Sequence, residues 1–292
     1  MRAALLLAPV LLVTACGGGS DESSASSAAT VTAAPTPAEP PSSAATSTAP
    51  PATATASTTA APTTSAVPTT PPVPDLIQEV VFGRSVEGRP LTAIERGTPG
   101  GTVVLVIGVI HGDEPAGTGV VERLRTAPLP DGIDLWLVDS VNPDGQLAGT
   151  RTNARQVDLN RNFPHRWAQL GAPGDDEYSG EGPSSEPEAE AIAGLIALLQ
   201  PDLGLWYHQD LFRIAPASGR GGRVRGRYAE LTGLPVGGIT GGTYTGTAAS
   251  WQRQAVPDGV SFIVELGPTL SDEEAGRHAS AVLQLATELP SI

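Results

Sequence analysis

The apolar segment Thr102–Ile110 restricts the fold of this 292-residue chain more than any other. It is rich in β-branched residues and too short to cross a membrane, so it is predicted to be a strand buried on both faces. His111 and Glu114 follow it, and Pro115 then opens a predicted helix. Open α/β sheets bind ligands in a crevice at the carboxyl ends of their strands. The imidazole of His111 and the carboxylate of Glu114 are expected to lie in such a crevice. On spacing alone, the plainer interpretation is a polar turn whose glutamate faces the helix N-terminus.

Further motifs occur on both sides of this strand. They are GRSVEGRPL (Gly83–Leu91), RTNARQVDLNRNFP (Arg151–Pro164), WYHQ (Trp206–Gln209) and FIVEL (Phe262–Leu266). The order HxxE, R(x8)NR, a strand-ending histidine and a strand-ending glutamate resembles the zinc carboxypeptidase (M14) family. Within that family, the likeness is greatest to the bacterial murein peptide amidase branch, and it covers roughly residues 76–290.

The histidines limit where a metal could bind. Zinc in hydrolases commonly takes three protein ligands, and the set His111, Glu114 and His208 offers two strand-ending histidines and a carboxylate. From the residues alone, His208 fits a ligand and a packed histidine equally well. The resemblance implies that the three bind one Zn²⁺ per chain, and that Asp158 holds the second ring nitrogen of His111. The remaining histidines are interpreted as surface or partly packed side chains: His165 and His278.

A carboxylate at the end of an apolar strand is costly unless it is paired or functional. For Glu265, one explanation is a salt bridge to one of the arginines. The resemblance implies instead that Glu265 is the general base. It also implies that Arg151 faces the carbonyl oxygen on which charge develops. Asn160 and Arg161 would bind a substrate carboxylate, for which the guanidinium fork is well suited.

Two other features remain open at the level of sequence. Many carboxypeptidases have a mobile tyrosine before the catalytic glutamate; Tyr244 and Arg253 compete for that position, and the role is left unassigned. A basic run could attract a substrate with several carboxylates or form a solvated face, and the solvated face is preferred. Its members are Arg213, Arg220, Arg223, Arg225 and Arg227.

The N-terminus has the layout of a secretory signal. Arg2 precedes the apolar run Ala3–Val13, which is too short to span a bilayer. The following residues end on Cys16 and resemble a lipoprotein signal; an ordinary signal peptide with an incidental cysteine is the alternative. The resemblance implies removal of residues 1–15, lipidation of Cys16 and an extracytoplasmic protein anchored to the cell membrane. With only one cysteine, neither a disulfide framework nor a cysteine metal site is possible within one chain.

Composition divides the rest of the chain into two parts. Residues 16–75 are almost wholly Gly, Ser, Thr, Ala and Pro, so the segment after Cys16 is predicted to be a disordered tether that lets the enzyme sample the cell wall. Residues 76–292 are predicted to form one catalytic domain. The formal net charge of −14 argues against nucleic-acid binding, which depends on neutralising phosphates.

The hydrophobic pattern of residues 76–292 alternates strands with helices. Predicted strands are 76–82, 91–96, 102–110, 133–139, 203–208 and 260–266; predicted helices are 115–126, 186–199 (capped by Ser185), 223–232, 248–255 and 272–288. Residues 140–184 are predicted to be a long loop. This order indicates a three-layer α/β/α domain with a mixed, mostly parallel sheet.

Together, these features predict a membrane-anchored zinc metallocarboxypeptidase or peptide amidase. The expected substrate is a peptide or muropeptide with a free carboxylate beside the cleaved amide, plausible examples being γ-D-glutamyl-diaminopimelate peptides of murein. One alternative is a deacylase of N-acyl amino acids, like succinylglutamate desuccinylase and aspartoacylase. Another is a non-catalytic cell-wall-binding lipoprotein, against which the complete set of site residues speaks.

Overall fold

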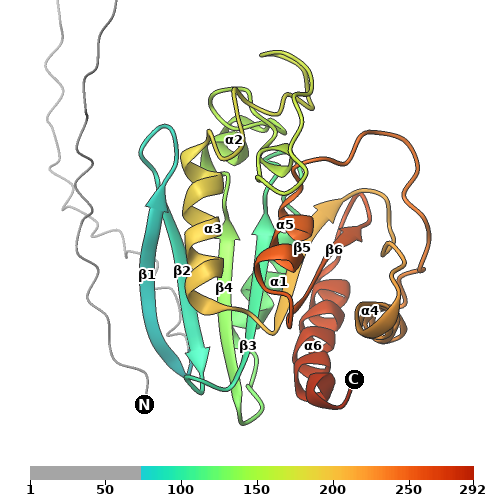
Figure 1. Cartoon of the computed structure of the whole chain (residues 1–292). Helices are drawn as coiled ribbons and strands as arrows, with labels where there is room; N and C mark the ends of the chain where they lie inside the picture. Colours follow the sequence, from blue (N-terminus) through green and yellow to red (C-terminus); the bar gives the residue numbers. More distant parts are fainter. Residues whose placement is uncertain (1–73) are drawn as a thin grey trace, which may run out of the picture. The chain divides into compact units, whose positions relative to one another are not determined.

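The computed structural model describes residues 74–292; the predicted signal segment, Cys16 and nearly all of the predicted tether lie outside them. The described chain forms one six-stranded sheet with helices on both faces (Figure 1). The strands are β1 Leu76–Arg84, β2 Pro90–Gly97, β3 Thr102–Val109, β4 Ile133–Ser140, β5 Leu203–Gln209 and β6 Val260–Leu266. The helices are α1 Gly117–Thr126, α2 Pro143–Ala148, η1 Leu159–Arg161, α3 Pro187–Leu199, α4 Gly219–Thr232, α5 Ala248–Ala255, α6 Asp272–Glu288 and η2 Leu289–Ser291.

The sheet has the strand order β1-β2-β4-β3-β5-β6. Strands β4, β3, β5 and β6 are parallel to one another, and the β1–β2 hairpin joins them through β2, which is antiparallel to β4. The predicted α/β fold with a mixed, mostly parallel sheet is therefore confirmed. Because parallel strands point their carboxyl ends to the same edge, the residues that end β3, β5 and β6 gather there.

Two hydrophobic cores explain why β3 is continuously apolar. Val104 and Val106 pack with α1, α4 and α6 on one face, whereas Leu105 and Ile107 pack with α3 and α5 on the other (Figure 1). Successive strand residues point to opposite faces, so a strand buried on both sides needs apolar residues throughout. Among residues 74–292, no helix combines the length and apolar character that crossing a membrane requires.

The GRSVEGRPL motif forms the turn of the β1–β2 hairpin and fixes it to α2. The Ser85 hydroxyl donates to Asp144 Oδ1 at 2.7 Å, and Arg89 forms an ion pair with the same carboxylate. Asp144 is buried in the first turn of α2, so its charge is balanced within the motif. The hairpin is thereby held against the segment that leads to Arg151.

The structure corrects three details of the predicted elements. The segment 140–184 is not wholly a loop, since it contains α2 and η1. The N-cap of α3 is Glu186 rather than Ser185, because the Ser185 hydroxyl already donates to Glu186 and accepts from Asn162. Helix α4 begins at Gly219, four residues before the predicted start (223 − 219 = 4).

His278 is also more deeply placed than predicted. It is 4% exposed, and its Nδ1 lies 2.8 Å from the Tyr228 hydroxyl, which in turn lies 2.7 Å from the Tyr207 hydroxyl. Burial, reinforced by the charge of Arg277, lowers the pKa of His278 to about 4. The prediction of a surface or partly packed side chain was therefore wrong for His278, whereas His165 is half-buried and lies outside the metal-binding group.

The lowered pKa of His278 predicts acid sensitivity of the fold. Below its ordinary pKa of 6.5, the unfolded chain takes up a proton that the folded chain does not. The free energy of unfolding should therefore fall between pH 6.5 and about 4, by up to about 3 kcal/mol from this group. His278→Gln, which can still accept from Tyr228, should lose less stability than the wild type between pH 7 and 4.5 in denaturant titrations. Equal losses in both proteins would contradict this assignment.

Candidate active site

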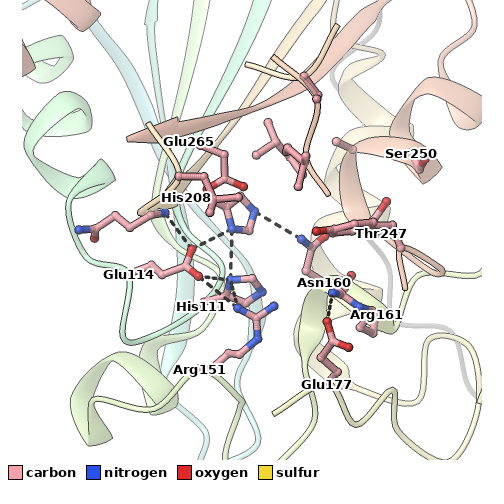
Figure 2. A pocket seen from close by; sticks show the side chains of 18 of the residues that line it. His111, Glu114, Arg151, Asn160, Arg161, Glu177, His208, Thr247, Ser250 and Glu265 are labelled. Atoms are coloured by element: carbon pink, nitrogen blue, oxygen red, sulfur yellow. Dashed lines mark hydrogen bonds and ion pairs between the residues drawn. The ribbon is translucent and has the colours of Figure 1, made fainter. Parts of the chain in front are cut away.

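The sheet order brings the strand-ending residues together. Strands β3 and β5 are neighbours, so His111, just after β3, lies beside His208 at the end of β5. His208 and Glu265 are register partners on β5 and β6, and their side chains share one crevice (Figure 2). Glu114 enters the same crevice from the turn between β3 and α1. All four residues come from the carboxyl edge of the sheet.

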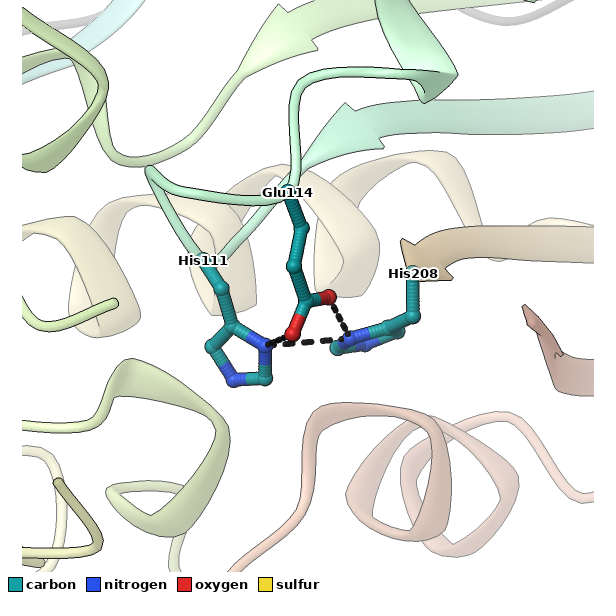
Figure 3. A group of neighbouring side chains, drawn as sticks. All are labelled: His111, Glu114 and His208. Atoms are coloured by element: carbon teal, nitrogen blue, oxygen red, sulfur yellow. Dashed lines mark hydrogen bonds and ion pairs between the residues drawn. The ribbon is translucent and has the colours of Figure 1, made fainter. Parts of the chain in front are cut away.

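His111, Glu114 and His208 form a group able to hold a metal ion (Figure 3). One ligand atom from each lies within 4.8 Å of the others. The Nδ1 atoms of the two histidines are 3.1 Å apart, and the Glu114 carboxylate reaches both, at 2.8 Å to His111 and 2.9 Å to His208. Two ring nitrogens and a carboxylate that converge in this way suit a cation placed between them.

The donor set and its surroundings fit zinc. Two imidazoles and one carboxylate are among the ligand sets that catalytic zinc takes. A metal-bound histidine normally has its other ring nitrogen held by a carboxylate or carbonyl group, and His111 Nε2 lies 3.1 Å from Asp158 Oδ1. The predicted contact between these two residues is therefore present in the structure.

The backbone around Gly112 determines where His111 and Glu114 point. A Cβ atom at Gly112 would lie 2.0 Å from the carbonyl carbon of Gly145, so only glycine permits this close approach to α2. The Glu114 amide donates to the His111 carbonyl at 3.1 Å, which closes the turn. The Gln209 amide donates to the Glu114 carboxylate at 3.1 Å and so ties this turn to the end of β5.

Asp158 joins the metal-binding group to its arginine neighbours. It is fully buried and accepts hydrogen bonds from Arg151 Nε and Nη2 at 3.1 and 2.8 Å. Burial alone would raise the pKa of Asp158, but His111, Arg151 and Arg161 together hold it well below its usual range. Arg151 Nη1 also donates to Glu114 at 3.2 Å, so the Arg151 guanidinium lies beside the candidate metal position.

Glu265 lies opposite this group with a free oxygen. It is 8% exposed, and its Oε2 is buried without a hydrogen-bond partner among the described residues. Burial, together with the negative charge of Glu114, raises the pKa of Glu265 to about 7. A carboxyl group that titrates near neutral pH can both accept and release a proton. The salt bridge that the sequence left open as an alternative does not form between Glu265 and any described arginine.

Asn160 and Arg161 lie on η1, on the other side of the cleft from Glu114 (Figure 2). Asn160 accepts from the Ala248 amide at 2.9 Å, which orients its side chain. Arg161 is buried and donates to Glu177 at 2.6 Å, while its guanidinium carbon lies 5.4 Å from the centre of the Tyr244 ring. Arg161 thus already holds a carboxylate that the chain itself supplies.

The site residues line one cleft of about 750 Å³. Sequence reasoning did not identify several residues that line it, among them Glu177, Thr247, Ser250 and Ile263. Glu177, Thr247 and Ser250 lie outside the quoted motifs, and they reach the cleft from a loop and from the start of α5 only through the tertiary fold. Ile263 lies within the FIVEL motif on β6, but an apolar strand residue carries no chemical signature. Tyr244, whose role was left unassigned, also lines the cleft, and Arg253 lines it as well.

Comparisons with known proteins agree on one family. The model of the family described as zinc carboxypeptidase matches residues 71–209. Murein peptide amidase A of Vibrio campbellii is 29% identical over 231 residues, which are 74% of this chain and 90% of that protein. The protein of the same name from Escherichia coli K12 is 29% identical over 215 residues, covering 70% of this chain and 87% of its own length.

Solved structures give the same result. The murein-tripeptide amidase MpaA from Escherichia coli O157 is 30% identical, with a TM-score of 0.57, and the match covers 71% of this chain and 91% of MpaA. The carboxypeptidase A from Helicoverpa armigera is 21% identical with a TM-score of 0.65, over 74% of this chain and 69% of that one. The match to carboxypeptidase A shows a shared fold alone. The match to MpaA, at 30% identity over 91% of its length, also shows membership of the same family.

Proposed function

The chain belongs to the zinc carboxypeptidase (M14) family and is a zinc-dependent hydrolase, and from this premise we propose that it cleaves an amide beside a free carboxylate in murein peptides. The bond we assign is that between γ-D-glutamate and diaminopimelate. The observation that carries the proposal is the arrangement of Glu265 and Arg161 on either side of the His111, Glu114 and His208 group. The murein peptide amidases that match along most of their length support the choice of substrate.

Each of these residues has a distinct task in hydrolysis. His111, Glu114 and His208 would hold the zinc ion, which when bound supplies a Lewis acid that polarises the carbonyl group and lowers the pKa of a water molecule. Glu265 accepts a proton from the attacking water and delivers it to the departing amine nitrogen, because its buried Oε2 has no hydrogen-bond partner among the described residues. Asp158 fixes the ring orientation of His111.

Two arginines handle negative charge in the substrate. The Arg151 guanidinium lies beside the metal-binding group and stabilises the charge that develops on the carbonyl oxygen. Arg161, with the neighbouring Asn160, binds the carboxylate beside the cleaved bond. Since Arg161 contacts Glu177 in the structure, the substrate carboxylate has to displace Glu177 from Arg161.

This competition yields a prediction for Glu177. Glu177→Gln removes the competing charge, so the KM of a carboxylate-bearing substrate should fall by roughly two- to fivefold, the value of a half-exposed ion pair. The kcat should change little. Steady-state kinetics with Asp176→Asn as the matched control test this, because Asp176 lines the cleft without an ion pair to Arg161. A KM that rises in Glu177→Gln would mean that Glu177 itself helps to bind substrate.

The substrate assignment is tested by a comparison of three amides. The enzyme should release diaminopimelate from a γ-D-glutamyl-diaminopimelate muropeptide faster than it cleaves an ordinary L-peptide or an N-acyl amino acid, as read by mass spectrometry. Faster cleavage of the L-peptide would indicate a general carboxypeptidase, and faster deacylation the deacylase alternative. No cleavage of any of the three would favour a binding protein.

Arg161 provides the second half of that test. Amidating the carboxylate beside the cleaved bond should reduce kcat/KM about ten- to a hundredfold, because hydrogen bonds to charged groups contribute about 1.5–3 kcal/mol. Arg161→Ala should abolish the difference between free and amidated substrates. Arg155→Ala is the control, since Arg155 is an exposed arginine of the same segment that pairs with Glu186. A difference that persists in Arg161→Ala would place the carboxylate site elsewhere.

We further propose that the enzyme is extracytoplasmic and is anchored to the cell membrane by a lipid on Cys16. The support is the sequence alone: an apolar run that ends on the only cysteine, followed by a Ser/Thr/Ala/Pro-rich segment. Cys16→Ala should move the protein from the membrane fraction to the medium or to an uncleaved precursor. Wild-type protein that is soluble with an unmodified Cys16 would rule the anchor out.

A further inference from the structure

The cleft extends beyond the metal-binding group and contains a second pair of arginines there. Arg225 of α4 and Arg253 of α5 both line it. Both donate to the carbonyl oxygen of Ser261 on β6, Arg253 Nη1 at 3.1 Å and Arg225 Nη2 at 3.5 Å. Ser261 precedes Glu265 by four residues (265 − 261 = 4), so the pair marks a part of the cleft displaced along β6 from the reacting groups.

Neither arginine has a carboxylate partner among residues 74–292. Apart from Ser261, Arg225 donates to the carbonyl groups of Ala215 and Pro216, and Arg253 donates to the Ser250 hydroxyl. Arg225 is 9% exposed, and its Nε is buried without a hydrogen-bond partner. Burial, together with the charge of Arg253, lowers the pKa of Arg225 to about 10.

The other cleft arginines differ in having carboxylate partners, although Arg161 Nε, like Arg225 Nε, is buried without a hydrogen-bond partner. Arg151 pairs with Asp158, and Arg161 pairs with Glu177. Two adjacent guanidinium groups, one of them buried, with no acid nearby are costly unless an anion joins them. The charges at this end of the cleft therefore fit an acidic ligand group.

Arg225 belongs to the basic run Arg213, Arg220, Arg223, Arg225 and Arg227. Most of its members have partners outside the cleft. Arg220 donates to the carbonyl groups of Asp258 and Leu289, Arg223 donates to that of Ile292, and Arg227 pairs with Glu288. Arg225 alone among the five lines the cleft. The run is thus largely a solvated face, with one member turned toward the site.

We propose that Arg225 and Arg253 bind a carboxylate at the end of the side chain of the residue that the enzyme releases. This inference rests on the proposed amidase function and adds a second acidic group to its substrate, distinct from the carboxylate held by Arg161. Ile263 and Ala249 line the cleft and suit the methylene groups of such a side chain. The pair donates to Ser261 near the start of β6, whereas Glu265 is near its end, and this displacement favours a long side chain over that of aspartate. The enzyme should therefore release a dicarboxylic amino acid with a long side chain. Diaminopimelate is such an amino acid.

The test uses four leaving residues on one acyl group. The four residues have side chains of the same length and differ only in the groups at the end. Diaminopimelate ends with both a carboxylate and an amine, 2-aminopimelate with a carboxylate alone, lysine with an amine alone, and norleucine with neither. The first two should give kcat/KM values roughly ten- to a hundredfold above the last two, because a charge-assisted hydrogen bond is gained. Equal values for diaminopimelate and lysine would overturn the proposal.

Substitutions assign the preference to the arginine pair. Arg253→Gln should bring the diaminopimelate-to-lysine ratio close to one, and Arg253→Glu should reverse it in favour of lysine. Arg220→Gln is the matched control, because Arg220 lies on α4 but donates to the carbonyl groups of Asp258 and Leu289 outside the cleft. A ratio that survives Arg253→Gln would overturn the proposal. Since buried Arg225 could be needed for folding, Arg253 is the variant of choice.

The outcome is separable from that of the proposed function. Donor preference tests the murein assignment: the γ-D-glutamyl group is compared with an L-aminoacyl group. The four leaving residues are then compared on whichever donor is cleaved faster. Calorimetric titration of the wild-type protein with free diaminopimelate and free lysine gives a readout that needs no turnover. Tighter binding of diaminopimelate, lost in Arg253→Gln, supports the arginine pair, and equal binding of both amino acids contradicts it.

Discussion

Glu265→Gln is expected to reduce kcat by about 10²–10⁴-fold, the usual cost of losing general acid–base catalysis. Glutamine keeps the size of the side chain but cannot accept the proton of the attacking water. Glu265 is suited to this task because it lines the cleft with His111, Glu114 and His208 and one of its carboxylate oxygens is buried without a partner among the described residues. Steady-state and single-turnover kinetics on the muropeptide measure the effect, while substrate binding should persist.

The matched control is Glu190→Gln, because Glu190 is an exposed glutamate on α3 that does not line the cleft. It should have wild-type kcat. Zinc content should be unchanged in both variants, which separates loss of the base from loss of the metal. Near-wild-type turnover in Glu265→Gln would mean that another group moves the proton.

His208→Ala is expected to abolish zinc binding and, with it, activity. The wild-type chain should contain about one zinc ion, whereas two remaining ligands cannot complete the site that catalytic zinc requires. Asp158→Asn leaves the three ligands in place but weakens the hold on His111, so zinc affinity should fall by about 10–100-fold. Elemental analysis and competition with a chelator measure both effects.

His165→Ala is the control for these variants, because His165 lies outside the metal-binding group. It should retain zinc and turnover. Full zinc occupancy in His208→Ala would exclude His208 as a ligand. Chelation of the wild type should also lower its thermal stability, since a metal that binds only the folded chain stabilises it by mass action.

Much of the fold could be predicted from the pattern of apolar residues. The run 102–110 corresponds to β3, and the predicted strand 260–266 and helix 272–288 agree with β6 and α6. These segments are clear because burial on both faces of a strand leaves a continuous apolar run, whereas burial along one stripe of a helix leaves a helical period. The same pattern predicts that His111, His208 and Glu265 each lie at or just after the end of an apolar strand.

The order of the strands could not be read in the same way. His208 lies beside His111 because β5 pairs with β3, and β4 lies between β3 and the hairpin. Nothing local in the sequence specifies that order, and the pattern of strands and helices predicts only a mixed, mostly parallel sheet. Local polar contacts were equally hidden, since the Ser185 hydroxyl bonds to Asn162 and Glu186 rather than capping α3.

The charged partners within the cleft were the least predictable part. Arg161 and Glu177 meet across a loop, and Arg225 and Arg253 meet from two different helices. In the sequence, each is one of many surface-type residues. Only the fold shows that Arg161 is paired with Glu177, whereas Arg225 and Arg253 have no carboxylate partner among the described residues. This difference leaves the second pair of arginines available to a substrate carboxylate.

Anomalous scattering from crystals of the zinc-loaded protein, measured on both sides of the zinc absorption edge, tests the metal centre most directly. One peak is expected per chain, between the Nδ1 atoms of His111 and His208 and the carboxylate of Glu114. A peak bound by other residues, or an active protein with no peak at this position, would contradict the assignment of these three residues as the zinc ligands.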